Sequence, residues 1–124
     1  MSLCLAAGSK VTAFAFTAFT LSWTHSVERV RWEEDWYLQA NRLAITEARV
    51  QGSGAGMEPA SDATLMNGWW RWTPDLPPQR SLVLAASGAT GGGWKICSQD
   101  KTACREIGKQ SADPVTIAPC DALP

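Results

Sequence analysis

The chain has 124 residues, with 11 basic and 12 acidic side chains and a formal net charge of −1 at pH 7. This length indicates one domain with a single core, and the balanced charge excludes nucleic acid as the main partner because it offers no basic surface. No stretch approaches the roughly 18 apolar residues of a membrane span, and Met1–Ala7 lacks the basic start and apolar length of a secretory signal. We therefore expect a soluble protein, cytoplasmic by default.

Two short strands are predicted at the start of the chain, Ser2–Ala7 and Lys10–Phe16. The second places its aromatic residues at even positions, Phe14 and Phe16, whereas the strand after it uses odd positions. A switch of parity near Thr17 predicts a β-bulge or a sharp bend. A sheet that turns a corner so early is typical of a sandwich or a small barrel.

The centre of the chain predicts a three-stranded antiparallel meander. Apolar residues alternate in Phe19–His25 and in Val30–Leu38, and a period of two is typical of strands. Two short polar turns, Ser26–Arg29 and Ala40–Asn41, join the three strands and set their register. The expected partners are Trp23 with Trp32, Leu21 with Glu34, Leu38 with Leu43, Trp36 with Ile45, Glu34 with Glu47, and Trp32 with Arg49.

This register brings two carboxylates and one arginine together. Glu34 interrupts an apolar face between Trp32 and Trp36, and Glu47 is expected opposite it, with Cβ atoms roughly 5 Å apart. Two such carboxylates raise one pKa unless Arg49, one pair along, compensates. Two interpretations remain open: a salt-bridged structural patch, which is the commoner arrangement, or a site that binds a ligand or handles a proton.

Residues suited to ligand binding gather at one edge of the meander, where its strand ends meet the Gly52–Met57 loop. Glycines in this loop permit positive φ and could shape an anion-binding concavity, although a plain connection between strands is the commoner role. His25 lies too far along its strand from Glu34 for a catalytic pair, and the cysteine spacing is not that of a zinc site. We predict no catalytic residue, metal or cofactor, and a ligand-binding set of His25, Ser26, Glu28, Glu34, Glu47, Arg49, Gly54 and Gly56.

The second half of the chain continues with strands. A short helical turn is expected within Met57–Asn67, followed by strands at Gly68–Pro74 and Arg80–Ser87 and a hairpin at Trp94–Ile107. Four cysteines permit three full disulfide connectivities. A bond between Cys97 and Cys104 is plausible because the two thiols lie across the hairpin mouth.

From Gly108 the apolar pattern ends among polar residues and prolines, so residues 108–124 are predicted to be a poorly ordered tail. Residues 1–107 are expected to form a single all-β domain, with about eight mainly antiparallel strands in a sandwich or small barrel.

Three pieces of the sequence resemble a known family. The run His25-Ser26-Val27-Glu28, then Glu34, then Gly54-Ala55-Gly56-Met57 is similar to a family of small bacterial proteins classed only as a domain of unknown function. The similarity also includes Gly68–Trp70 and Trp94–Cys97. Members are frequently encoded beside TAXI-type TRAP transporters, the tripartite importers of organic acids, and many look exported. The resemblance implies an association with transport, with a TRAP transporter component or a small organic acid as the partner.

Two functional hypotheses follow from these observations. The first is a non-enzymatic accessory or ligand-binding protein linked to organic-acid uptake, which binds at the edge formed by His25, Ser26, Glu28 and the glycine loop. The second is a small hydrolase or isomerase in which Glu34 and Glu47 perform acid–base work. We favour the first, because the sequence offers no nucleophile paired with a base.

Overall fold

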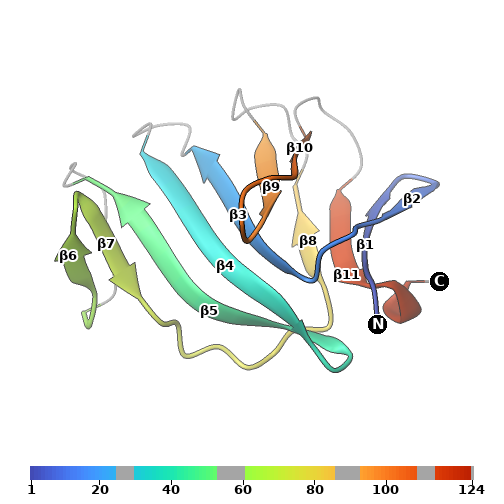
Figure 1. The fold of residues 1–124 in the computed structure, drawn as a ribbon, viewed down its shortest axis with the longest axis horizontal. Helices are drawn as coiled ribbons and strands as arrows, with labels where there is room; N and C mark the ends of the chain where they lie inside the picture. The colour runs from blue at the N-terminus through green and yellow to red at the C-terminus, as the bar shows by residue number, and fades with distance from the viewer. Residues whose placement is uncertain (25–29, 53–60, 86–92, 109–113, 124) are drawn as a thin grey trace.

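A computed structural model describes residues 1–24, 30–52, 61–85, 93–108 and 114–123 (Figure 1). Within these ranges the chain forms eleven strands and one turn of 3-10 helix, η1. None of the described elements is a helix long and apolar enough to cross a membrane. The elements are β1 Leu3–Ala7, β2 Lys10–Ala13, β3 Ala18–Thr24, β4 Arg31–Gln39, β5 Arg42–Gln51, β6 Thr64–Met66, β7 Trp69–Trp72, β8 Leu82–Leu84, β9 Trp94–Ser98, β10 Cys104–Ile107, β11 Val115–Pro119 and η1 Cys120–Ala122.

The strands form two antiparallel sheets. The smaller has the order β2-β1-β11-β8 and the larger the order β10-β9-β3-β4-β5-β7-β6. Figure 1 shows the strands spread from β6 at one end of the molecule to β2 at the other, with both chain termini beside β1 and β11. The all-β prediction is confirmed, and the arrangement is a sandwich of two packed sheets.

Apolar residues from both sheets form the core between them. Successive side chains of a strand point to opposite faces, so Phe19 and Leu21 of β3 point inward and are almost fully buried. The same alternation buries Leu3 and Leu5 of β1. Among the described residues, the buried apolar cluster consists of Leu3, Leu5, Phe19, Leu21, Trp36, Leu43, Leu84, Ile96, Ile107, Val115 and Ile117.

The chain passes from the smaller sheet to the larger one between Ala13 and Ala18. This crossing is the bend that the change of parity near Thr17 predicted. Phe14 still donates a backbone hydrogen bond to Leu3 at 2.9 Å, whereas the carbonyl of Thr17 accepts one from Leu38 of β4 at 2.9 Å. The segment between them therefore bonds to strands of both sheets.

The register of the central strands agrees with the prediction over most of their length. Trp23 lies opposite Trp32 and Leu21 opposite Glu34 in the β3–β4 pair, as expected. In the β4–β5 pair the partners next to the turn are also those predicted, Leu38 with Leu43 and Trp36 with Ile45. The length of the turn therefore predicted the β4–β5 pairing correctly from the turn as far as Trp36.

Beyond that point a β-bulge changes the register. The pairing shifts between Asp35 and Trp36, so that Thr46 of β5 has no partner of its own and its hydroxyl donates to the backbone carbonyl of Asp35 at 3.2 Å. The predicted pairs Glu34 with Glu47 and Trp32 with Arg49 are therefore wrong. The observed partners are Glu34 with Ala48, Asp35 with Glu47, Glu33 with Arg49 and Trp32 with Val50.

Two further predictions need correction. Residues 108–124, predicted to be a poorly ordered tail, contain β11, which lies between β1 and β8 and buries Val115 and Ile117 in the core. The helical turn expected within Met57–Asn67 is not formed in its described part, because Thr64–Met66 is strand β6. Residues 57–60 lie outside the described ranges.

Two disulfides connect the four cysteines. Cys97 and Cys104 are joined across the β9–β10 hairpin, where the sequence made a bond plausible. The second disulfide joins Cys4 of β1 to Cys120 at the start of η1, 116 positions apart. It fastens the end of the described chain to the first strand.

Candidate functional site

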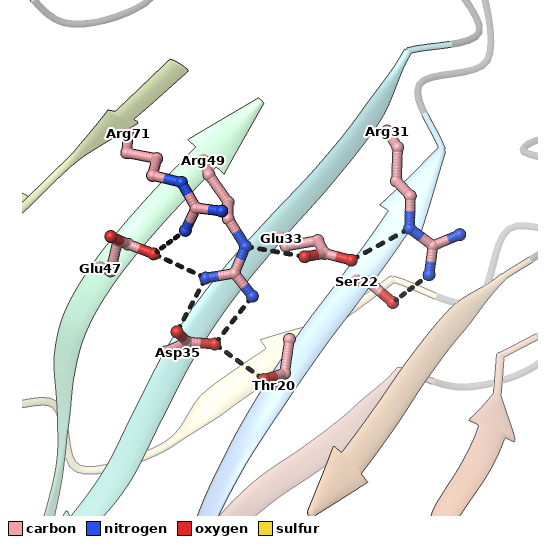
Figure 2. A network of polar contacts seen from close by, with 8 residues as sticks. All are labelled: Thr20, Ser22, Arg31, Glu33, Asp35, Glu47, Arg49 and Arg71. Atoms are coloured by element: carbon pink, nitrogen blue, oxygen red, sulfur yellow. Dashed lines mark hydrogen bonds and ion pairs between the residues drawn. The ribbon is translucent and has the colours of Figure 1, made fainter. Parts of the chain in front are cut away.

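The most connected polar group is a cluster of charged side chains centred on Arg49 of β5 (Figure 2). The Arg49 side chain is only 8% exposed. Its Nε donates to Glu33 at 2.7 Å and its Nη1 donates to Asp35 and to Glu47, each at 2.8 Å. Its Nη2 makes a further bond of 3.1 Å to Asp35. Every nitrogen of this guanidinium therefore contacts a carboxylate.

Four more side chains complete what we call the Arg49 cluster. Arg31 donates to Glu33 at 3.1 Å and to Ser22 at 3.2 Å, while Arg71 donates to Glu47 at 2.9 Å. The Thr20 hydroxyl donates to Asp35 at 2.7 Å. Three arginines thus balance three carboxylates, and the full set is Thr20, Ser22, Arg31, Glu33, Asp35, Glu47, Arg49 and Arg71 (Figure 2).

The cluster follows from the strand register. Ser22, Glu33, Arg49 and Arg71 are successive partners across β3, β4, β5 and β7. Partners across a sheet share one face, and residues two apart on a strand lie on the same side. The parity that points Phe19 and Leu21 into the core therefore turns this row toward the opposite face of the sheet.

The cluster favours the charged forms of Glu33 and Asp35. Burial alone would raise the pKa of Glu33, but hydrogen bonds from Arg49 and Arg31 outweigh it and bring that pKa below its ordinary value. For Asp35 burial is likewise outweighed by hydrogen bonds from Arg49 and Thr20, so its pKa is also lowered. Burial would lower the pKa of Arg49, yet its bonds to Asp35 and Glu33 raise it. Groups fixed as ions in this way are poor proton carriers near neutral pH.

Glu34 lies on the other face of the sheet, among aromatic side chains. Its carboxylate accepts a hydrogen bond of 3.0 Å from Trp36 Nε1. Burial raises the pKa of Glu34, and the bond from Trp36 offsets this only in part. Beside it runs a row of packed rings, with centroid distances of 4.9 Å for Trp94–Trp23, 6.2 Å for Trp23–Trp32 and 6.4 Å for Trp32–Trp72.

The raised pKa of Glu34 predicts that Glu34→Gln increases thermal stability at neutral pH. A carboxyl with a raised pKa binds its proton more tightly in the folded state, so stability falls as pH rises through the interval between its unfolded and folded pKa values. Glutamine carries no charge and can still accept the bond from Trp36. The midpoint of thermal unfolding should be higher than that of wild type at pH 7, with the difference disappearing at acidic pH. If the midpoints of Glu34→Gln and wild type differed by the same amount at pH 7 and at acidic pH, the charge of Glu34 would not be the cause.

The predicted ligand-binding residues do not come together as one site in the described part of the chain. Arg49 and Glu47 are in contact, as expected, but Glu34 is on the opposite face of the sheet. The remaining members, His25, Ser26, Glu28, Gly54 and Gly56, lie outside the described residues.

Sequence reasoning missed the residues that surround Arg49 most closely. Arg31, Glu33 and Asp35 occupy every second position of β4 and lie opposite two threonines and a serine of β3. These charged residues at every second position were visible in the sequence and mark a polar face of the sheet. Within the described ranges, no group of three or more His, Cys, Asp or Glu side chains could hold a metal ion.

The fold and the Arg49 cluster define a small, disulfide-linked, antiparallel β protein with a charge-balanced face on its larger sheet. The model of one family, Domain of unknown function (DUF1850), matches residues 19–104, and the chain belongs to this family. The matched part begins in β3 and ends in β10, so it contains the whole cluster but neither β1 nor β11. No curated protein and no solved structure matches the chain.

Proposed function

We propose that this protein is a non-enzymatic accessory protein that binds a small solute and is associated with TRAP-type uptake of organic acids. The link to transport rests on the resemblance of the His25–Glu28 and Gly54–Met57 motifs to proteins encoded beside such importers. The non-enzymatic part rests on the observed chemistry of the sheet.

The observation that carries the proposal is that every carboxylate of the Arg49 cluster is bonded to an arginine within it. Such a network holds four strands in place, and the lowered pKa values of Glu33 and Asp35 make these two carboxylates poor proton carriers near pH 7. The hydrolase or isomerase hypothesis depended on a Glu34–Glu47 pair, and these residues face opposite sides of the sheet.

The two disulfides support a place of action outside the reducing cytosol, because such bonds persist in oxidising compartments. This part of the proposal departs from the cytoplasmic default expected from the sequence. It agrees with the resemblance, which implies exported relatives. A solute-binding accessory protein of an importer would meet its ligand in such a compartment.

The proposal predicts that a small organic acid stabilises the oxidised protein without being converted. At a hundredfold excess of ligand over its dissociation constant, the free energy of unfolding should rise by about 2.7 kcal/mol. Thermal unfolding in the presence of organic acids, amino acids and divalent cations measures this, with glycerol at equal concentration as a neutral control.

Proton NMR of the incubated mixtures then shows whether a stabilising solute stays chemically intact. Turnover of that solute would contradict the non-enzymatic function. If none of the solutes raised the midpoint, the ligand-binding function would be wrong.

A further inference from the structure

One concavity lies away from the Arg49 cluster, between the smaller sheet and the tip of the β4–β5 hairpin. Its volume is about 720 Å³, within the range of pockets that hold small ligands. We propose that this concavity, here named the Arg42–Arg80 pocket, binds the carboxylate of a small organic acid. This assignment rests on the proposed ligand-binding function and names its site and the chemical class of its ligand.

Three stretches that are distant in the sequence form the pocket. They are the tip of the β4–β5 hairpin, the residues just before and in β8, and the outer face of β11 together with the residues in and after η1. Figure 1 shows the hairpin tip reaching below the lower ends of β8 and β11. Val83 and Thr116 are partners in the sheet, and because their neighbours Leu84 and Val115 are buried in the core, this pair faces outward.

Covalent and backbone bonds hold these segments in position. Leu43 and Gln79 exchange two backbone hydrogen bonds of 2.7 Å, which places the adjacent Arg42 and Arg80 on the same side of the molecule. The Cys4–Cys120 disulfide anchors η1, and Cys120 also donates a backbone bond of 2.9 Å to Ser2. A pocket fixed before binding loses little conformational entropy when a ligand enters.

The charge of the pocket selects the ligand. In the described part of the chain, the side chains of Arg42 and Arg80 make no hydrogen bond or ion pair. Arg49 differs, because each nitrogen of its guanidinium is bonded to a carboxylate. A guanidinium presents paired donors that match the two oxygens of a carboxylate. Asn41 and Ser81 line the same wall and add polar groups. Two unpaired arginines therefore make this the anion-binding part of the pocket.

The remaining lining distinguishes an organic acid from an inorganic anion. Val83, whose surface is 64% exposed, and Leu123 provide apolar contacts for a carbon skeleton. Ala118 and Ala122 are small and leave room for it. Asp121 also lines the pocket, and its negative charge offsets one of the two arginine charges. The lining fits a mono- or dicarboxylate with an apolar portion.

Isothermal titration calorimetry of the oxidised full chain tests the assignment. The probes are succinate, glutarate, 2-oxoglutarate and benzoate, with inorganic phosphate and choline chloride for comparison. At least one carboxylate should bind, and its Kd should rise about tenfold or more in Arg42→Gln and in Arg80→Gln, as expected for the loss of a charge-assisted hydrogen bond. Asp121→Asn should bind the same acid as well as wild type or more tightly, because a repelling charge is removed.

Arg105→Gln is the matched control, because Arg105 is exposed on β10, away from the pocket, and its replacement changes net charge equally. Since Arg42 and Arg80 are exposed, these variants should unfold at the wild-type midpoint, which separates loss of binding from loss of fold.

An acid that binds the Arg42 and Arg80 variants as tightly as the control would overturn the site while leaving the ligand-binding function in place. Binding of phosphate or choline alone would overturn the ligand class, and a complete absence of binding would overturn the site and its class. In that last case, the thermal-unfolding measurements with organic acids, amino acids and divalent cations show whether the proposed ligand-binding function is wrong as well.

Discussion

Replacing Arg49 by methionine is expected to lower the free energy of unfolding by about 3 kcal/mol at pH 7, the lower end of what removing one partner of a buried ion pair costs. Methionine has a similar length but leaves three carboxylates close together without their shared counter-ion. Arg71 still bonds to Glu47 and Arg31 to Glu33, whereas Asp35 retains only the Thr20 hydroxyl. Because these carboxylates are 14% to 34% exposed, water offsets part of the loss.

The pH dependence separates this electrostatic effect from a packing defect. The pKa values of Glu33 and Asp35 are lowered in the folded protein, so their contribution to stability is present above the unfolded pKa and is lost as pH falls through the folded pKa. The difference between wild type and Arg49→Met should therefore shrink below about pH 4, the ordinary range of carboxylates. Urea denaturation at several pH values measures it, with the exposed Arg105→Met as a matched control. A constant difference across this pH range would show that packing causes the loss.

The strands could be predicted because alternation is a local property of the chain. Val30–Leu38 carries its own period of two, and the short turn at Ala40–Asn41 determines which residues pair next to it. The bulge could not be predicted in the same way. Thr46 is one ordinary residue in a continuous strand, without the glycine or proline that often marks an irregularity.

The bulge at Thr46 determined which carboxylates surround Arg49. Glu47 and Arg49 lie two apart on β5, so their contact does not depend on the neighbouring strand and was predicted correctly. Their partners on β4 do depend on the register. A shift of one residue exchanges the two faces of a strand, and it replaced Glu34 by Glu33 and Asp35 as the carboxylates that contact Arg49.

Strand β11 escaped prediction for a different reason. It is five residues long, it follows Pro114, and it ends at Pro119 in a polar stretch that is typical of a tail. Its place in the sheet comes from partners at the other end of the chain, since Leu3 lies opposite Pro119 and Leu5 opposite Ile117. Contacts across such a separation leave no local signal in the sequence. For the same reason the Arg42–Arg80 pocket, whose wall includes β11, was not visible before the structure.

The disulfide that secures β11 predicts the second large effect. In the double variant Cys4→Ser/Cys120→Ser, the free energy of unfolding should fall by about 4–5 kcal/mol, because the lost bond closes a loop of roughly a hundred residues in the unfolded chain. The observed separation is 116 positions for Cys4–Cys120 and 7 for Cys97–Cys104. The chain-entropy relation gives only about 2 kcal/mol for the short loop. Cys97→Ser/Cys104→Ser is therefore an internal control with the same chemical change.

Urea denaturation of the two double variants under non-reducing conditions provides the comparison, since it yields both the free energy and its dependence on denaturant. The m-value should increase more in Cys4→Ser/Cys120→Ser, because its unfolded chain is released from the larger loop and exposes more surface. Equal losses in the two variants would mean that loop length does not determine the effect and that local packing around Cys4 and Cys97, both buried, does. If the long-loop variant alone falls to marginal stability, the protein depends on an oxidising compartment to fold. The protein would then act only in an oxidising compartment, as proposed, because η1 and the Arg42–Arg80 pocket would form only where Cys4 and Cys120 are oxidised.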